Sequence, residues 1–248
     1  MSSQPLGDEV KSKHQDAGPS ASTSKAQATA AAGRRPRILV ISMLYISWTR
    51  EIYPYLLEAI QARAEFRHAI DPLDAFIELS SVPPYDAVIV TDEAAATEPY
   101  AQLASGLLQY IREGGTVVFT CLFGCFLTQA LFNRFFQRTG LNWRWRSFRE
   151  ATVLKNTIFV PQAVADRLPA HYNQTGVLLH NVDLADAWYS NIDDWIMHGA
   201  FDQEAEYSLM NETAAAMGRF CEGKVGYVSD IELGNGSLNI VLAMCDIL

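Results

Sequence analysis

The stretch Gly114–Gly124, GGTVVFTCLFG, decides the fold that we expect for this chain. Its glycine pair ends a helix, Thr116–Thr120 is a typical buried strand, and the chain then turns sharply into another helix. On α/β sheets such a strand-to-helix turn displays a nucleophile at its tip. Here the residue at the tip is Leu122, and Cys121 comes one residue earlier.

Strands and helices alternate on both sides of this stretch. Continuous β-branched runs, such as ILVISM from Ile38 and DAVIVTD from Asp86, are typical of parallel strands covered on both faces. Periodic apolar residues predict helices over Thr49–Ala62, Glu98–Glu113 and Phe126–Arg138. We therefore predict an α/β fold, a flavodoxin-like three-layer sandwich with a mainly parallel central sheet. Ligands are expected at the carboxyl ends of its strands.

The later half changes character. Shorter strands are predicted over Ala151–Val160, Gly176–Val182 and Ala214–Val228. Within the last range, Met217–Val228 is predicted as a late β-hairpin that turns at Glu222-Gly223. Asn142–Glu150 alternates Trp and Arg, which predicts a half-buried strand, with a stacking platform for bases or a sugar as the alternative. Leu238–Ile247 is predicted as a final apolar helix.

Composition separates a tail from one folded domain. Residues 1–36 lack aromatic side chains and are predicted to be disordered, and residues 37–248 are predicted to form a single α/β domain. The net charge is −9, and the tail carries five Lys/Arg against three Asp/Glu, so the remainder carries −11. An acidic domain repels phosphate backbones, so no nucleic-acid partner is expected. No apolar run suits a signal peptide or a membrane span, so we expect a cytoplasmic protein without membrane contact.

Several segments together resemble a known superfamily. The first strand, the DAVIVTD strand, the GGTVVF strand with its turn and the late EGKVGYVSD segment are similar to the class I glutamine amidotransferase-like fold. The segments Gly140–Trp143, Asn181-Val182 and Ala187–Tyr189 are similar to those of fungal cytosolic members of unassigned function. The resemblance covers about residues 36–248.

The resemblance implies a catalytic pattern that this sequence lacks. Active members carry Gly-x-Cys-x-Gly at the turn and His-x-Glu after a late strand. Here Leu122 fills the nucleophile position, Asp230 stands in place of the histidine, and Glu232 keeps the carboxylate position. The resemblance therefore implies a catalytically silent domain, a pseudoenzyme.

Alternatives remain for each candidate catalytic residue. Cys121 is a reactive thiol if the turn is shifted by one residue, or a buried core thiol otherwise. Asp230 and Glu232 are a pair that binds a cation or serves as acid and base, or a solvated turn or helix cap. His180 lies at a predicted strand end and is either a spare base or structural. No metal site and no cofactor are predicted, since CxxC, HExxH, Walker A and GxSxG patterns are absent from the sequence.

Three functions are consistent with these residues. The first is a silent domain that binds a small molecule or a protein partner at the strand edge. The second is a cysteine-dependent hydrolase or amidotransferase-type enzyme that uses Cys121 with His180 or Asp230. The third is a homodimer subunit that associates through its last helix and the loop Trp188–Trp195. The predicted ligand-binding residues are Met43, Tyr45, Trp48, Asp92, Leu122, Phe123, Gly124 and Trp188.

Overall fold

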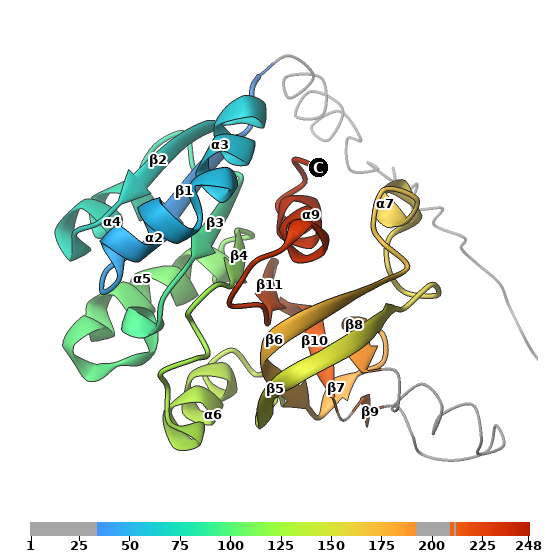
Figure 1. Ribbon diagram of the computed structural model, residues 1–248. Helices are drawn as coiled ribbons and strands as arrows, with labels where there is room; N and C mark the ends of the chain where they lie inside the picture. The colour runs from blue at the N-terminus through green and yellow to red at the C-terminus, as the bar shows by residue number, and fades with distance from the viewer. Residues whose placement is uncertain (1–33, 192–208, 211) are drawn as a thin grey trace, which may run out of the picture. The chain divides into compact units, whose positions relative to one another are not determined.

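The structure of the chain is a computed structural model that describes residues 34–191, 209–210 and 212–248 (Figure 1). Arg35–Leu248 forms one compact unit. Residues 1–33 of the predicted tail lie outside the described residues, as do residues 192–195 of the aromatic loop.

The N-terminal half of the sheet is parallel and buried. Each strand in it pairs in parallel with its neighbours. All residues of its central strands β3 and β4 are buried, and their β-branched side chains suit strands that are covered on both faces. The order across this half is β2 (Glu65–Ala69), β1 (Arg37–Ile41), β3 (Ala87–Val90), β4 (Thr116–Phe119) and β11 (Gly223–Val228).

Helices cover both faces of this half. α3 and α9 pack on one face, and α5 and α6 pack on the other. The helix expected over Thr49–Ala62 is instead two helices, because Pro54 lacks an N–H and disfavours helical geometry at Tyr53. None of the helices in the described part of the chain has the length and apolarity needed to cross a bilayer. The α-helices are α2 (Ile46–Ile52), α3 (Pro54–Arg63), α4 (Pro72–Leu79), α5 (Ala101–Arg112), α6 (Gln129–Gln137), α7 (Gln162–Ala165) and α9 (Asn235–Met244), and the 3-10 helices are η1 (Glu93–Ala96) and η2 (Glu98–Tyr100).

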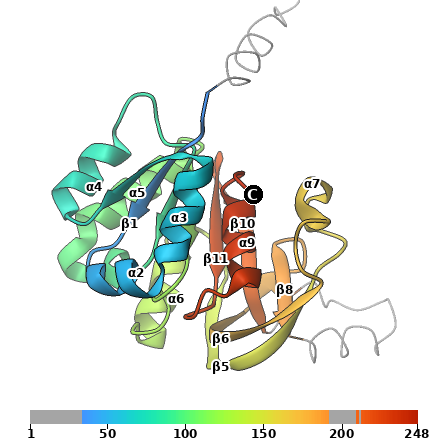
Figure 2. The ribbon, with the colours of Figure 1, turned by 45° about the horizontal axis from the view of Figure 1, so that its top comes forward.

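The C-terminal half of the sheet is antiparallel and closes on itself. β10 pairs with β6, β6 with β5, and β5 with β8, while β8 also pairs with β10. These strands therefore form a closed barrel, and β11 lies between the barrel and the parallel strands (Figure 2). A separate pair consists of β7 (Val182–Asp183) and β9 (Leu209–Met210). The barrel strands are β5 (Arg144–Lys155), β6 (His171–His180), β8 (Ala187–Asn191) and β10 (Thr213–Phe220).

The expectation of a mainly parallel, flavodoxin-like three-layer sandwich is wrong. Within the nine-stranded sheet, five strand pairings are antiparallel. Only four are parallel. The physical reason lies in the connections: parallel neighbours need crossover helices, and α7, the only α-helix between β5 and β10 in the described residues, has a single turn.

A tight contact fixes the hairpin of β10 and β11 against the parallel half. The strands turn at Cys221–Glu222, and Gly223 begins β11. A Cβ atom added to Gly223 would lie 2.1 Å from the carbonyl oxygen of Ile111 and 2.4 Å from that of Gly115. These obstacles are backbone atoms, so only a glycine permits this approach.

We expect Gly223→Ala to lower the free energy of unfolding by about 3 kcal/mol or more, because backbone has to move. Gly106→Ala is the matched control: Gly106 lies within α5, and its added Cβ would meet Leu79 Cδ1 at an ordinary 3.4 Å. That variant should gain roughly 0.5–1 kcal/mol through helix propensity. Urea denaturation measures both, and equal effects of the two substitutions would contradict this account of the hairpin.

Candidate functional site

The turn after β4 has the backbone of an elbow. Thr120 N–H donates to Val90 O (3.0 Å) and Leu122 N–H donates to Thr91 O (2.9 Å), so both flanks of the turn are tied to β3 and its loop. Between them Cys121 adopts a left-handed conformation, with φ of +56°. The tip of the turn is therefore Cys121, one position earlier than the sequence predicted.

The helix that follows does not reach this thiol. α6 begins only at Gln129, where the side chain of Thr128 accepts a hydrogen bond from Leu131 N–H. A helix N-terminus next to a cysteine would stabilise the thiolate. Because several loop residues separate Cys121 from α6, that stabilisation is missing here.

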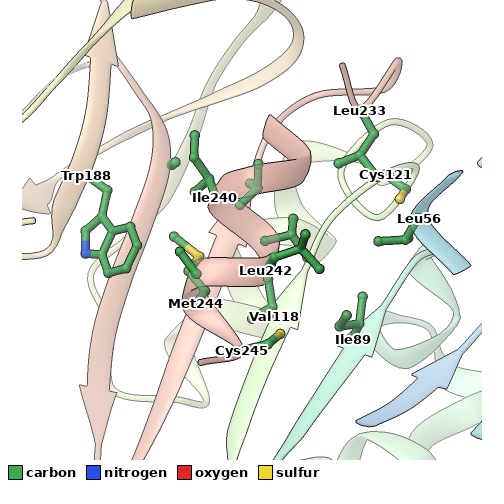
Figure 3. Close-up of a cluster of buried hydrophobic side chains, with 14 of the residues drawn as sticks. Leu56, Ile89, Val118, Cys121, Trp188, Leu233, Ile240, Leu242, Met244 and Cys245 are labelled. Carbon is green, nitrogen blue, oxygen red and sulfur yellow. The ribbon is translucent and has the colours of Figure 1, made fainter. Parts of the chain in front are cut away.

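The side chain of Cys121 is buried. It is 4% exposed and belongs to the apolar cluster that includes Leu56 and Leu233 (Figure 3). Burial raises the pKa of the Cys121 thiol well above its usual range, and the nearby Asp230 carboxylate raises it further. The space between this turn, β6 and the loop after β11 is too small for a water molecule.

Two tyrosines near Cys121 bond to the loop that follows β11. Tyr53 OH donates to Ile231 O (2.5 Å), and Tyr55 OH donates to Glu232 O. These bonds clasp the start of α3 to the loop that follows β11. We call this pair of hydrogen bonds the tyrosine clasp.

Asp230 holds the loop after β11 together. Its carboxylate accepts from Glu232 N–H (3.2 Å), Gly234 N–H (3.1 Å) and Ser237 Oγ–H (2.5 Å). Asp230 is 2% exposed, whereas Glu232 is exposed to solvent. The two acids therefore do not share an environment, and Asp230 is occupied by the start of α9.

Asp92 has a similar role on the neighbouring strands. Its buried carboxylate accepts from Met43 N–H (2.6 Å), Leu44 N–H (2.9 Å) and Ala94 N–H (3.1 Å). These bonds join the loop after β1 to the loop after β3. Met43 and Asp92 thus lie together at the carboxyl edge of the sheet, as parts of its framework.

The other candidates in the turn pack against the rest of the chain, and His180 lies at the end of β6. Phe123 packs in the apolar core against Phe119 (ring centroids 4.5 Å apart) and the aromatic side chains of α6. Leu122 is buried, and Gly124 lies so close to Tyr227 that an added Cβ would come within 2.8 Å of its hydroxyl. His180 lies beside Arg144 and Arg146; burial, followed by Arg146, lowers the pKa of its imidazole.

Trp188 lies on the other side of α9 from Cys121 (Figure 3). It lines a separate cavity of about 420 Å³ between α7, β10 and the end of α9, together with Met217, Met244 and Asp186. Burial raises the pKa of Asp186 to about 6, and Asp183 adds to the effect. Sequence reasoning missed this cavity, because its walls come from elements whose pairing the sequence does not reveal.

An open aromatic surface lies at the carboxyl edge of the parallel strands. The ring of Tyr45 lies 5.6 Å from that of Trp48 and 5.1 Å from that of Phe126. Trp48 is 44% exposed and Phe126 is 53% exposed. Tyr45 OH donates to the carboxylate of Glu93 at 3.1 Å. We call Tyr45, Trp48, Phe126 and Glu93 the aromatic surface.

The sequence signalled only part of this surface. Tyr45 and Trp48 were among the predicted ligand-binding residues, but Phe126 and Glu93 were not. Glu93 follows Asp92 at a strand end, which is the one signal that could have identified it. Among the residues that the structure describes, no three His, Cys, Asp or Glu side chains gather as metal ligands would.

Comparisons with known proteins identify the fold. No family model matches the chain, and no curated protein matches it. Solved structures do. A protein described as ThuA-like from Bacteroides uniformis has a TM-score of 0.56 at 11% identity, over 87% of this chain and 91% of that chain. Another from Parabacteroides merdae has a TM-score of 0.55 at 13% identity, over 86% and 89%. A cytoplasmic protein from Salmonella typhimurium has a TM-score of 0.50 at 12% identity, over 85% and 99%.

The expected membership among fungal class I glutamine amidotransferase-like proteins is wrong. Several of the segments that suggested it are short buried strands, and such segments look alike in many unrelated α/β sheets. The solved structures that share the arrangement of the whole unit are instead described as ThuA-like. At these identities the similarity shows the fold alone: this chain has the fold of ThuA-like structures.

Proposed function

We propose that this chain is a catalytically silent domain that binds a small molecule or a protein partner at the carboxyl edge of its parallel strands. The observation that carries the proposal is a contrast along one loop. Cys121 is sealed from solvent at the start of the loop, whereas Phe126 is exposed further along it as part of the aromatic surface. The position that a nucleophile would occupy is therefore closed to solvent, whereas the aromatic surface next to it is open to a ligand.

The form of the aromatic surface favours a protein partner over a small molecule. Small ligands are usually enclosed in a cleft that buries most of their surface. Trp48 and Phe126 instead stand at the surface, about half exposed. Exposed aromatic residues that lie together are typical of interfaces, where they contribute a large share of the binding energy.

One observation favours a second function, a cysteine-dependent enzyme. The left-handed conformation of Cys121 is the one that a nucleophile elbow uses. Against this function stand the raised pKa of the thiol, the closed space around it and the use of Asp230 by the loop. A conformational opening of the tyrosine clasp would have to precede any reaction.

The homodimer and the cytoplasmic location remain predictions. The last helix, α9, packs inside the core of its own chain, with Ile240 and Val241 fully buried, so a dimer would need another surface. Light scattering tests the dimer. Cys121, Cys125, Cys221 and Cys245 are all free thiols, which is consistent with a reducing compartment.

The state of Cys121 predicts its reactivity. In native protein at neutral pH, iodoacetamide should label Cys121 on the order of a hundred times more slowly than the exposed Cys221, because the thiol is buried and its pKa is raised. Mass spectrometry of tryptic peptides measures both rates in one sample. In urea the two cysteines should label at similar rates.

Turnover provides the second arm of this test. We expect no ammonia from glutamine and no acid from p-nitrophenyl acetate above the level of Cys121→Ser. Fast labelling of Cys121, together with turnover that this substitution abolishes, would overturn the proposal of a silent domain. It would support the cysteine-dependent enzyme instead.

The two acids after β11 should differ in their effect on stability. Asp230→Ala removes three hydrogen bonds to the loop and to α9, so we expect a loss of about 2 kcal/mol in the free energy of unfolding. Glu232→Ala is the control: its exposed side chain should matter by less than about 0.5 kcal/mol. Thermal and urea unfolding give the comparison, and an equal loss in both variants would argue against the loop-holding role of Asp230.

A further inference from the structure

The aromatic surface has a defined geometry that the proposed function does not explain. Tyr45 stands in the middle, with interplanar angles of 37° to Trp48 and 38° to Phe126. The backbone carbonyl of Tyr45 is fixed by Thr49, whose N–H (2.9 Å) and Oγ–H (3.1 Å) both donate to it. Two separate segments, one around α2 and one after β4, thus bring three tilted rings together at the surface.

A buried carboxylate contacts the central ring of the aromatic surface, that of Tyr45. Glu93 is only 6% exposed, and one of its oxygens accepts from Tyr45 OH. Its other oxygen, Oε2, is buried without a hydrogen-bond partner among the described residues. The charge of a carboxylate with an unpartnered buried oxygen is poorly compensated, and burial, followed by Glu93 and Asp92, raises the pKa of the Tyr45 hydroxyl.

The carboxylates of Glu93 and Asp92 act on Tyr45, the central ring of the aromatic surface. Asp92 lies next to Glu93 and is buried as well. Arg50, the basic residue of α2, lies toward His68, where burial and this arginine lower the pKa of the imidazole. A cation placed over the rings would be attracted by their negative π-faces and by the charge of the buried carboxylates near Tyr45, whereas an anion would be repelled by both.

We propose that the aromatic surface recognises the cationic side chain, lysine or arginine, of a protein partner. This inference rests on the proposed function, because it names the ligand of the same surface. Ring faces within about 6 Å attract an ammonium or guanidinium group, and the negative charge of the buried carboxylates near Tyr45 adds to that attraction. The acidic balance of the chain, −9 overall, attracts a basic partner from a distance.

The test is an NMR titration with a glycine-flanked lysine peptide, read at the indole signal of Trp48. The variant Trp48→Phe assigns that signal by removing it. A peptide with norleucine in place of lysine has nearly the same shape without the charge. We expect the lysine peptide to shift the signal in a saturable way and the norleucine peptide to bind at least about threefold more weakly.

Variants separate the charge from the rings. Glu93→Gln keeps an acceptor for Tyr45 OH but removes the charge, and Trp48→Ala removes one ring; each should weaken lysine-peptide binding about threefold to fivefold. The Trp48→Ala variant is read at the Phe126 ring signals. Phe148→Ala is the matched control, since Phe148 is an aromatic residue of β5 that is 47% exposed. Its binding should equal that of the unaltered chain.

Each of the other outcomes would overturn a different part of the proposal. Equal binding of the norleucine peptide would overturn recognition of a cation and leave an apolar partner at the same surface. Tighter binding of free n-butylamine than of the lysine peptide would overturn the protein partner in favour of a small amine. Binding of neither peptide overturns this inference alone, whereas turnover dependent on Cys121 overturns the proposed function.

Discussion

The parallel pairing of β4 with β11, which joins Thr116–Phe119 to Lys224–Tyr227, is the contact on which the rest of the structure depends. On one side it completes the parallel half, whose edge would otherwise end at β4. On its other side β11 pairs with β10, which belongs to the barrel. The same pairing brings the turn after β4 next to the loop after β11, so Cys121 and Asp230 become neighbours. The glycine contact at Gly223 holds the pairing at its other end.

The parallel strands could be predicted from the sequence, and the barrel could not. β1, β3 and β4 are short continuous apolar runs, a pattern that arises when helices cover both faces. The direction of a strand, in contrast, depends on its partner, and no periodicity reports it. Tyr45, Trp48 and Asp92 were placed at one edge because the ends of parallel strands meet there. Trp188 and His180 belong to the antiparallel half, so that rule did not apply to them.

The turn after β4 has the backbone conformation of a nucleophile elbow, although its cysteine, Cys121, is buried and not available as a nucleophile. A left-handed residue other than glycine costs about 1–2 kcal/mol, so the surrounding bonds have to hold it. Here the bonds from Thr120 and Leu122 to the loop of β3 hold it in place. The turn redirects the chain from the sheet toward α6 and carries Phe126 to the surface. The strained conformation of Cys121 therefore sets the path of the loop, while its thiol packs in the apolar core.

The tyrosine clasp also has a consequence for how the chain folds. Tyr53 and Ile231 are separated by 178 positions, and nearly the whole folded unit lies between them. Contacts of such long range form late, since the chain between them has to be ordered first. On the ribosome the first strands and helices therefore emerge with the thiol of Cys121 uncovered and the edge of β4 unpaired. Until the last residues are released, the thiol of this half is open to oxidation and its unpaired strand edge is open to wrong strand partners. The need for chaperones therefore depends on how quickly synthesis finishes.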